Sequence, residues 1–405
     1  MMNLTSRRRT TTILASAATL TLLAGCSATA SPEEKIVLTV LNKNVNEPDK
    51  TIFIDLLDGC AEQIGVTLNQ QQVPGAEIIQ RILQQASSHT LPDLLEIDNP
   101  ELKGIAATGA LAPLSDLGID TAGFNEAFIE SATWEGEVYG LGPQVNTLGL
   151  FYNAEMLAAA GLEPPTTWDE LKATAAALRQ GDVYGVAFSA AASYQGTWQF
   201  LPFMWSNGGD ETDLTSPEVA EAAQLWVDLV NSGGASESVV TWTQADVTDQ
   251  FIAGKAAMAV SGPWQVPLLD AVDFDWGVVK IPVPEAGDPV VASFGGEVWS
   301  VPLSDSPERM AKATELLECI NTPESQMELA SKRYTVPTRD DLFDDYLAEY
   351  PLMEPFAETI VTARARTAKL GEGWPVAATT IYEALQLAIT GQETAPNAFV
   401  VASTH

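Results

Sequence analysis

The sequence predicts an α/β fold of two lobes, each a mainly parallel sheet flanked by helices, and three observations predict it. Between residues 36 and 97, runs typical of buried strands alternate with runs of helical periodicity, the order that places helices on the faces of a parallel sheet. The same alternation returns after residue 148. The chain has 405 residues, more than one hydrophobic core usually supports, and no Pro-, Gly- or Ser-rich linker divides it. We therefore expect the chain to cross between the lobes more than once.

The strands and helices can be placed in order along the chain. Compact or alternating apolar runs predict strands over 36–41, 66–72, 93–97, 148–152, 183–188 and 256–261. Helical spacing of apolar residues predicts helices over 51–64, 76–87, 171–179 and 308–320. Thr167 and Glu170 form a capping box before the third of these helices. Ser-Pro or Thr-Pro pairs mark further helix starts at Ser216, Ser306 and Thr322.

The amino terminus has the pattern of a bacterial export signal. Arg7, Arg8 and Arg9 precede an apolar run over 11–24, which is shorter than the about 20 residues that a membrane-spanning helix needs. The box Leu23-Ala24-Gly25-Cys26 resembles the bacterial lipoprotein cleavage site, at which the cysteine becomes the acylated mature terminus. We expect a signal peptide over 1–25, a linker over 26–36, and lipidation at Cys26 that holds the protein on the outer face of the cell membrane. An ordinary secretory signal with a stray cysteine is the alternative.

The composition excludes some partners. With 54 acidic and 20 basic residues the formal net charge is −34, so the surface repels nucleic acid and anionic lipid heads. Neutral or cationic ligands fit such a surface better. Two cysteines remain besides Cys26, and an extracytoplasmic compartment allows Cys60 and Cys319 to pair; two buried thiols are the alternative.

The sequence supplies little for catalysis. It has two histidines, His89 and His405, and it lacks the nucleophile-elbow, zinc-protease, dinucleotide-binding and P-loop motifs. The sequence therefore indicates no enzyme, no cofactor and no metal site. No carboxylate pair for glycoside hydrolysis is singled out among the 54 acidic residues, and a secreted glycosidase is kept as an alternative.

The tryptophans point to a ligand. All ten lie at or after position 134. An indole can cover the flat C–H face of a sugar while carboxylates and amides hold its hydroxyls. Four tryptophans fall in helix or strand patterns and are predicted to be structural: Trp168, Trp226, Trp276 and Trp299. Three others stand beside turn-forming or polar residues, where binding residues tend to lie, and are predicted to contact a ligand: Trp242, Trp264 and Trp374.

Several stretches match one family in order along the chain. They are LPDLLEID (91–98), ATGALAPLSD (107–116), GEVYGLGPQVNTLGLFYNAEML (136–157), GLEPPTTWDELKATAAAL (161–178), FIAGKAAMAVSGPW (251–264), SFGGEVWSVP (293–302) and TVPTR (335–339). The chain resembles the extracellular solute-binding proteins of bacterial ABC importers, in the carbohydrate-binding group that includes maltooligosaccharide-binding proteins. The stretch ARARTAKLGEGWP (363–375) departs from the family's usual Arg-Pro pattern.

The resemblance implies lobes made of discontinuous segments. Crossings would lie near 142–146, 293–296 and 339–342, giving an N-lobe of 37–143 plus 296–340 and a C-lobe of 144–295 plus 341–402. Ligands of such folds bind between the lobes at the carboxyl ends of the strands. Besides the three tryptophans, this implies ligand contacts from Asn42, Asp98, Asn146, Tyr194, Gln195, Gly295, Gly296 and Glu297.

The resemblance also implies a function and partners. A monomer would capture a mono- or oligosaccharide unchanged and deliver it to ABC permease subunits with a cytoplasmic ATPase. A cationic ligand such as a polyamine, bound by the same fold, is an alternative, because aromatic side chains also bind cations.

Overall fold

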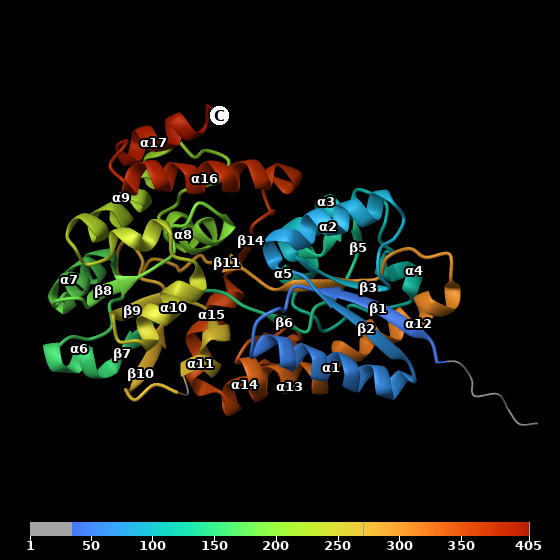
Figure 1. Cartoon of the computed structure of the whole chain (residues 1–405). Helices are drawn as coiled ribbons and strands as arrows, with labels where there is room; N and C mark the ends of the chain where they lie inside the picture. Colours follow the sequence, from blue (N-terminus) through green and yellow to red (C-terminus); the bar gives the residue numbers. More distant parts are fainter. Residues whose placement is uncertain (1–34, 270, 405) are drawn as a thin grey trace, which may run out of the picture. The chain divides into compact units, whose positions relative to one another are not determined.

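The computed structural model describes residues 35–269 and 271–404, so the predicted signal peptide and the lipidation site Cys26 lie outside the described residues. Two four-stranded sheets organise residues 36–404, and each has its own covering helices (Figure 1). We call the first sheet with its helices the first lobe, and the second sheet with its helices the second lobe. The two-lobed α/β prediction is confirmed at this level.

The first lobe is built on a mainly parallel sheet with strand order β12-β3-β1-β2. The strands β1 (Val37–Asn42), β2 (Thr67–Gln72) and β3 (Leu94–Asp98) run parallel, and β12 (Glu297–Ser300) runs antiparallel to β3. The helices α1 (Asp49–Ile64) and α2 (Gly75–Ser87) connect the parallel strands, as this strand order requires. The edge strand β12 comes from far along the chain, so the first lobe is discontinuous in sequence.

The second sheet, with strand order β10-β7-β9-β8, differs from the prediction. Only β8 (Tyr184–Ala187) and β9 (Ala256–Ser261) run parallel. The strand β7 (Gly149–Asn153) is antiparallel to both of its neighbours, β9 and β10 (Trp276–Val279). The prediction of a mainly parallel sheet is therefore wrong for this lobe. A buried strand reads as an apolar run whichever way it points, so the sequence pattern carried no information about its direction.

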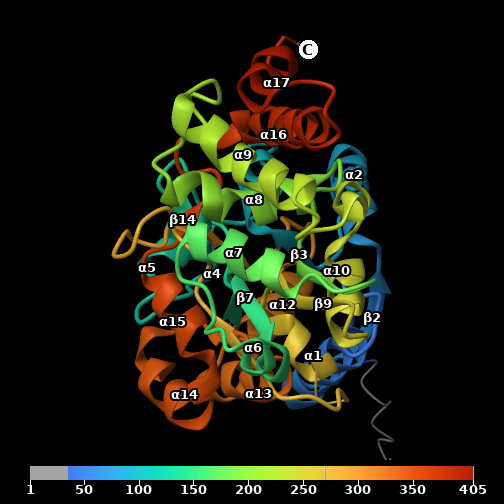
Figure 2. The same ribbon diagram turned by 90° about the vertical axis from the view of Figure 1, so that its left-hand side faces the viewer.

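Helices complete both lobes, and those after α2 have the following bounds: α3 (Leu102–Ala106), α4 (Leu114–Leu117), α5 (Glu126–Ser131), α6 (Ala154–Ala160), α7 (Trp168–Leu178), α8 (Tyr194–Ser206), α9 (Pro217–Asn231), α10 (Gln244–Ile252), α11 (Val266–Leu269), α12 (Pro307–Ile320), α13 (Pro323–Arg333), α14 (Phe343–Glu349), α15 (Glu354–Val361), α16 (Trp374–Ile389) and α17 (Ala395–Ala402). In the turned view, α16 lies over α8 and α9 and carries α17 (Figure 2). None of the helices in the described part of the chain is long and apolar enough to cross a membrane.

The predicted helix starts are confirmed by their caps. The hydroxyl of Thr167 accepts the amide N–H of Glu170, whose carboxylate accepts the amide N–H of Thr167 in return. Ser216, Ser306 and Thr322 each accept an amide N–H from the first turn of α9, α12 and α13, and each is followed by proline. Local sequence therefore fixes where these helices begin.

Short paired segments lie where the chain was expected to cross between the lobes. The strand β6 (Gln144–Val145) pairs with β13 (Val336–Pro337), and Asn146 bridges to Gly295. The strand β11 (Ser293–Phe294) pairs in parallel with β14 (Arg364–Ala365), a segment that the sequence did not place at the crossing. A hairpin of β4 (Thr133–Trp134) and β5 (Glu137–Val138) adds to the first lobe. The lobe boundaries given above stay predictions.

The structural tryptophans lie in the predicted elements. Trp168 and Trp226 belong to α7 and α9, and Trp276 and Trp299 belong to β10 and β12. Trp374 does not lie in a loop as predicted, because it is the first residue of α16 and is only 2% exposed. The adjacent Pro375 explains why α16 begins at Trp374, since proline is favoured in the first turn of a helix.

The two remaining cysteines form a disulfide. Cys60 of α1 and Cys319 of α12 are bonded, with their Cα atoms 5.8 Å apart. The bond joins the two sequence-distant parts of the first lobe, and the loop it closes contains the whole second sheet.

We expect the double variant Cys60→Ser/Cys319→Ser to lose about 3–5 kcal/mol of unfolding free energy, because the bond removes the closure entropy of a very long loop from the unfolded chain. Urea denaturation of the oxidised protein and of the variant measures the difference. Reducing the wild type should reproduce the variant's midpoint; equal midpoints for oxidised wild type and variant would contradict the expectation.

Candidate functional site

Charged side chains gather at one edge of the first sheet. Lys43 and Asn44 directly follow β1, and Glu96 and Asp98 lie near the end of β3. Glu297 begins the antiparallel β12 and stands opposite Asp98 in the register. The ends of two parallel strands and the start of an antiparallel one therefore meet at one edge, which is where folds of this kind bind ligands.

Lys43 ties two carboxylates together. Its Nζ lies 2.6 Å from Glu297 Oε1, and its backbone N–H donates to Glu96 Oε2 at 2.8 Å. The Asn44 Nδ2 also donates to Glu96 Oε2 at 3.2 Å. Glu96 is 1% exposed and Glu297 is 9% exposed. Buried carboxylates are tolerated here because each receives N–H donors from the residues that follow β1.

Asp98 has a second cation as its partner. Arg366 Nη2 donates to Asp98 Oδ1 at 2.8 Å and to Asn99 Oδ1 at 3.2 Å. The guanidinium carbon of Arg366 also lies 4.6 Å from the ring centroid of Trp198, so a cation–π contact adds to the ion pair. Arg366 follows β14 and Trp198 belongs to α8, whereas Asp98 ends β3, so this contact joins the first sheet to segments outside it.

The close packing shifts the proton affinities of these groups. Burial, helped by the negative charge of Glu297, raises the pKa of Glu96 from 4.5 to about 7. Burial, the largest single influence, would raise the pKa of Asp98, but the charges of Arg366 and Lys43 and the hydrogen bonds from Arg366 and Asn99 together hold that pKa below its usual value. In the same way burial is the largest influence on Glu297, but the charges of Lys43 and Arg333 and the hydrogen bond from Lys43 together lower its pKa. The three carboxylates raise the pKa of Lys43 although its burial opposes this.

The glycine pair lets the backbone run close to this cluster. Gly296 has φ +132°, a conformation that L side chains rarely adopt, and its carbonyl accepts the Asn99 N–H at 3.3 Å. A Cβ on Gly295 would lie closer than 3.0 Å to Asn146 Oδ1 and to the Trp198 indole. Glycine is therefore needed at both positions for steric reasons, whatever the pair does toward a ligand.

The structure brings together six of the eleven residues expected at the ligand site. These are Asn42, Asp98, Asn146, Gly295, Gly296 and Glu297, which are linked by the contacts above and by the Asn44 N–H donating to Asn42 Oδ1 at 3.1 Å. The Nδ2 of Asn42 is buried and has no partner among the described residues. This amide therefore keeps one unused hydrogen-bond donor beside the cluster.

The other five expected residues make none of these contacts, although Tyr194 lies near enough to Arg366 for that charge to act on its pKa. Tyr194 is 40% exposed at the start of α8, and burial together with the nearby Glu101 raises its pKa. Gln195 accepts the Gln244 N–H at 2.8 Å, next to the loop that holds Trp242. Trp242 and Trp264 are half-buried, and the Trp264 ring lies on Gly262. Trp374 is buried in the core of the second lobe.

Sequence reasoning missed several residues of the cluster: Lys43, Asn44, Glu96, Asn99, Trp198 and Arg366. Lys43 and Asn44 could have been found, because they follow Asn42 at the end of a predicted strand. Glu96 was not singled out within its apolar strand, although a carboxylate in a buried run needs a partner. Arg366 lies in the stretch that departs from the family pattern, and nothing local joins it to Asp98.

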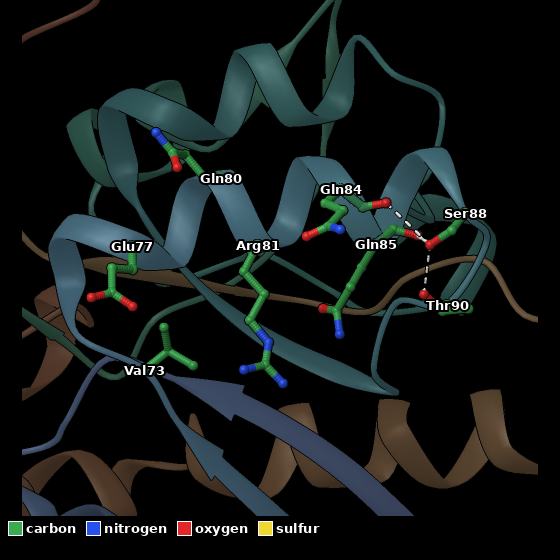
Figure 3. Close-up of a pocket in the computed structure, with 8 residues that line it drawn as sticks. All are labelled: Val73, Glu77, Gln80, Arg81, Gln84, Gln85, Ser88 and Thr90. Atoms are coloured by element: carbon green, nitrogen blue, oxygen red, sulfur yellow. Dashed lines mark hydrogen bonds between the residues drawn. The ribbon is translucent and has the colours of Figure 1, made fainter.

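A separate hollow of about 620 Å³ lies on the first lobe (Figure 3). It is lined by α2 and the turns on either side of it, with Val73, Glu77, Gln80, Arg81, Gln84, Gln85, Ser88 and Thr90 around it. None of these residues belongs to the charged cluster. The positive charge in its lining is that of Arg81, whose guanidinium donates a hydrogen bond to the neighbouring Gln71 Oε1 at 2.7 Å.

We expect stability to respond to pH through Glu96. The pKa of Glu96 is higher in the folded chain than in the unfolded chain, so the folded chain binds more protons. The free energy of unfolding therefore falls as the pH rises from 4.5 to about 7. Glu96→Gln cannot titrate. Across that window the wild type should lose about 3 kcal/mol more unfolding free energy than the variant. Urea denaturation at several pH values tests this, with the exposed Glu130→Gln as control; parallel profiles for wild type and Glu96→Gln would refute it.

Comparison with known proteins gives the family. A family model described as bacterial extracellular solute-binding protein matches residues 55–355. A protein of Brucella abortus (strain 2308) named as a binding protein is 25% identical over 346 residues, covering 82% of this chain and 83% of that one. The maltodextrin-binding protein MdxE of Bacillus subtilis (strain 168) is 22% identical over 300 residues, covering 68% of each chain. The crystal structure of the cyclic α-maltosyl-1,6-maltose binding protein from Arthrobacter globiformis has a TM-score of 0.76 at 26% identity, covering 91% of this chain and 97% of that one. Because the family model spans more than half of the chain, this protein belongs to the bacterial extracellular solute-binding proteins.

Proposed function

We propose that this protein is the sugar-binding component of an ABC importer, and that it captures an uncharged mono- or oligosaccharide between its lobes and releases it unchanged. The observation that carries the proposal is the internal ion pairing of the cluster in a chain of this family. Lys43 pairs with Glu297 and Arg366 pairs with Asp98, so these two carboxylates do not need a cation from the ligand. Similar proteins named for maltodextrin and cyclic maltosyl-maltose support the ligand class.

The site offers the groups that a sugar needs. The unpartnered Asn42 Nδ2 can donate to a hydroxyl, and Asp98, whose side chain is 35% exposed beside Arg366, can accept from one. The half-buried rings of Trp242 and Trp264 are the proposed stacking surfaces. In this proposal closure of the lobes over the sugar favours the bound state, since a ligand shifts the population toward the form that holds it better.

The location and the partners of the protein follow from its family and from the proposed function. The extracellular family places the chain outside the cytoplasm. We propose that Cys26 carries the lipid anchor, that the protein acts as a monomer, and that the loaded form docks on the permease subunits. Relatives and family are binding proteins rather than enzymes, and we propose that this chain likewise has no hydrolytic activity. Incubation with oligosaccharides should therefore release no new reducing ends; steady turnover would support a glycosidase instead.

A thermal-shift screen against a panel of sugars should reveal at least one that raises the melting temperature, because ligands of the native state stabilise it by mass action. Titration calorimetry at low and high salt then separates the ligand classes. Neutral sugar binding should hardly change with salt, whereas polyamine binding should weaken clearly. Polyamine binding without any sugar response would overturn the proposal.

Replacing the proposed stacking rings should weaken sugar binding. We expect Trp242→Ala and Trp264→Ala each to cost about 1–2 kcal/mol, or roughly tenfold in dissociation constant, because each removes aromatic contact area. Trp134→Ala, in the β4–β5 hairpin of the first lobe, is the matched control and should leave affinity unchanged. Unchanged affinity in the double variant Trp242→Ala/Trp264→Ala would rule out these rings as the binding surface.

A further inference from the structure

Arg366 sits in a pocket that is built like a binding site for a cation. Its guanidinium makes hydrogen bonds to both Asp98 oxygens, at 2.8 and 3.4 Å, and to Asn99 Oδ1 at 3.2 Å. The Trp198 ring lies against it at 4.6 Å. A carboxylate, an amide oxygen and an indole face are the three groups by which proteins recognise alkylammonium and guanidinium ligands.

The walls of this pocket are fixed independently of Arg366. Asn99 is 1% exposed, its N–H donates to the Gly296 carbonyl at 3.3 Å, and its Nδ2 donates to the Phe294 carbonyl at 3.3 Å. Trp198 is 7% exposed and packs in the core of the second lobe. The pocket therefore belongs to the fold, and Arg366 is the group that fills it.

Arg366 belongs to the segment 364–366, which is also held to the second lobe. Two residues earlier, Arg364 contacts Glu211, lies 3.3 Å from Asp210 Oδ2, and has its guanidinium carbon 4.4 Å from the Trp205 ring centroid. Arg364 therefore holds this segment to the second lobe, while Arg366, which follows the short strand β14, reaches Asp98 of the first sheet.

We propose that Arg366 acts as an internal ligand: it occupies a cation site made by Asp98, Asn99 and Trp198, and by filling it makes the site selective for uncharged solutes. The selectivity part rests on the proposed function, whereas the occupancy part does not. In a protein of net charge −34, an open site with a free Asp98 would attract cations from solution. Because the Arg366 guanidinium is part of the chain, it occupies the site without having to bind from solution, and it excludes those cations.

The test is chemical rescue by a small cation. In Arg366→Ala the pocket keeps its carboxylate, amide and indole but loses its occupant. Millimolar ethylguanidinium should then raise the melting temperature of this variant in a saturable way, and should do the same to a smaller extent or not at all in the wild type. Putrescine should also stabilise Arg366→Ala, in a manner that salt weakens.

A matched control separates the pocket from charge alone. Arg309 makes a comparable two-point contact with Asp93, at 2.8 and 2.5 Å, but its side chain is 39% exposed and no indole lies against it in the described structure. Arg309→Ala changes the net charge equally and should show little rescue. The double variant Asp98→Asn/Arg366→Ala should lose the rescue. The proposal is overturned if Arg366→Ala responds no more than Arg309→Ala, or if the double variant responds as strongly as Arg366→Ala.

A reciprocal variant covers the case in which Arg366→Ala does not fold. Asp98→Ala leaves the guanidinium on Trp198 without its carboxylate, so acetate should stabilise this variant saturably and leave the wild type unchanged; no acetate response would count against the proposal. The sugar panel on the wild type is read separately. Its failure would remove the proposed function while the rescue by ethylguanidinium would still report on the pocket.

Discussion

The pairing of buried charges at the end of the first sheet is the constraint on which the rest of this structure depends. Glu96 and Glu297 would each be costly to bury alone, because a buried ion without a partner loses several kcal/mol of solvation, and Asp98 beside them is half-buried. Lys43 and Arg366 supply the missing partners at hydrogen-bonding distance. One cation comes from the strand end itself, and the other from a segment about 270 residues away in the chain. The site therefore exists only when distant segments have come together.

The same constraint explains the crossing segments. Glu297 can stand opposite Asp98 only because β12 returns to the first sheet after the four strands of the second sheet. The glycine pair before it lets the backbone pass Asn146 and Trp198 without a side chain in the way. The disulfide between α1 and α12 then fixes the returning segment to the first one. Packing, covalent linkage and charge pairing all hold the two sequence-distant parts of the first lobe in one arrangement.

Charge and aromatic surface have different roles in the proposed site. The ion pairs set the shape of this end of the sheet and give two of its three carboxylates a cationic partner, and a sugar would meet them mainly as hydrogen-bond partners. The indoles supply contact area, which favours flat apolar faces without specifying charge. This division of roles explains how a strongly acidic protein can form the proposed site, which favours an uncharged ligand.

The sequence by itself determined the local elements, the family and the strand ends where the site lies. Caps such as Thr167 with Glu170, and apolar runs such as β1, β3 and β9, act over a few residues, so their patterns can be read directly. Asn42 and Asp98 were proposed as ligand contacts because they follow such runs, and Glu297 because the family resemblance places it at a crossing. Only the tertiary structure decided the antiparallel direction of β7, the burial of Trp374 and the union of Arg366 with Asp98. These depend on which distant segments pack together, and a local pattern of residues carries no record of that.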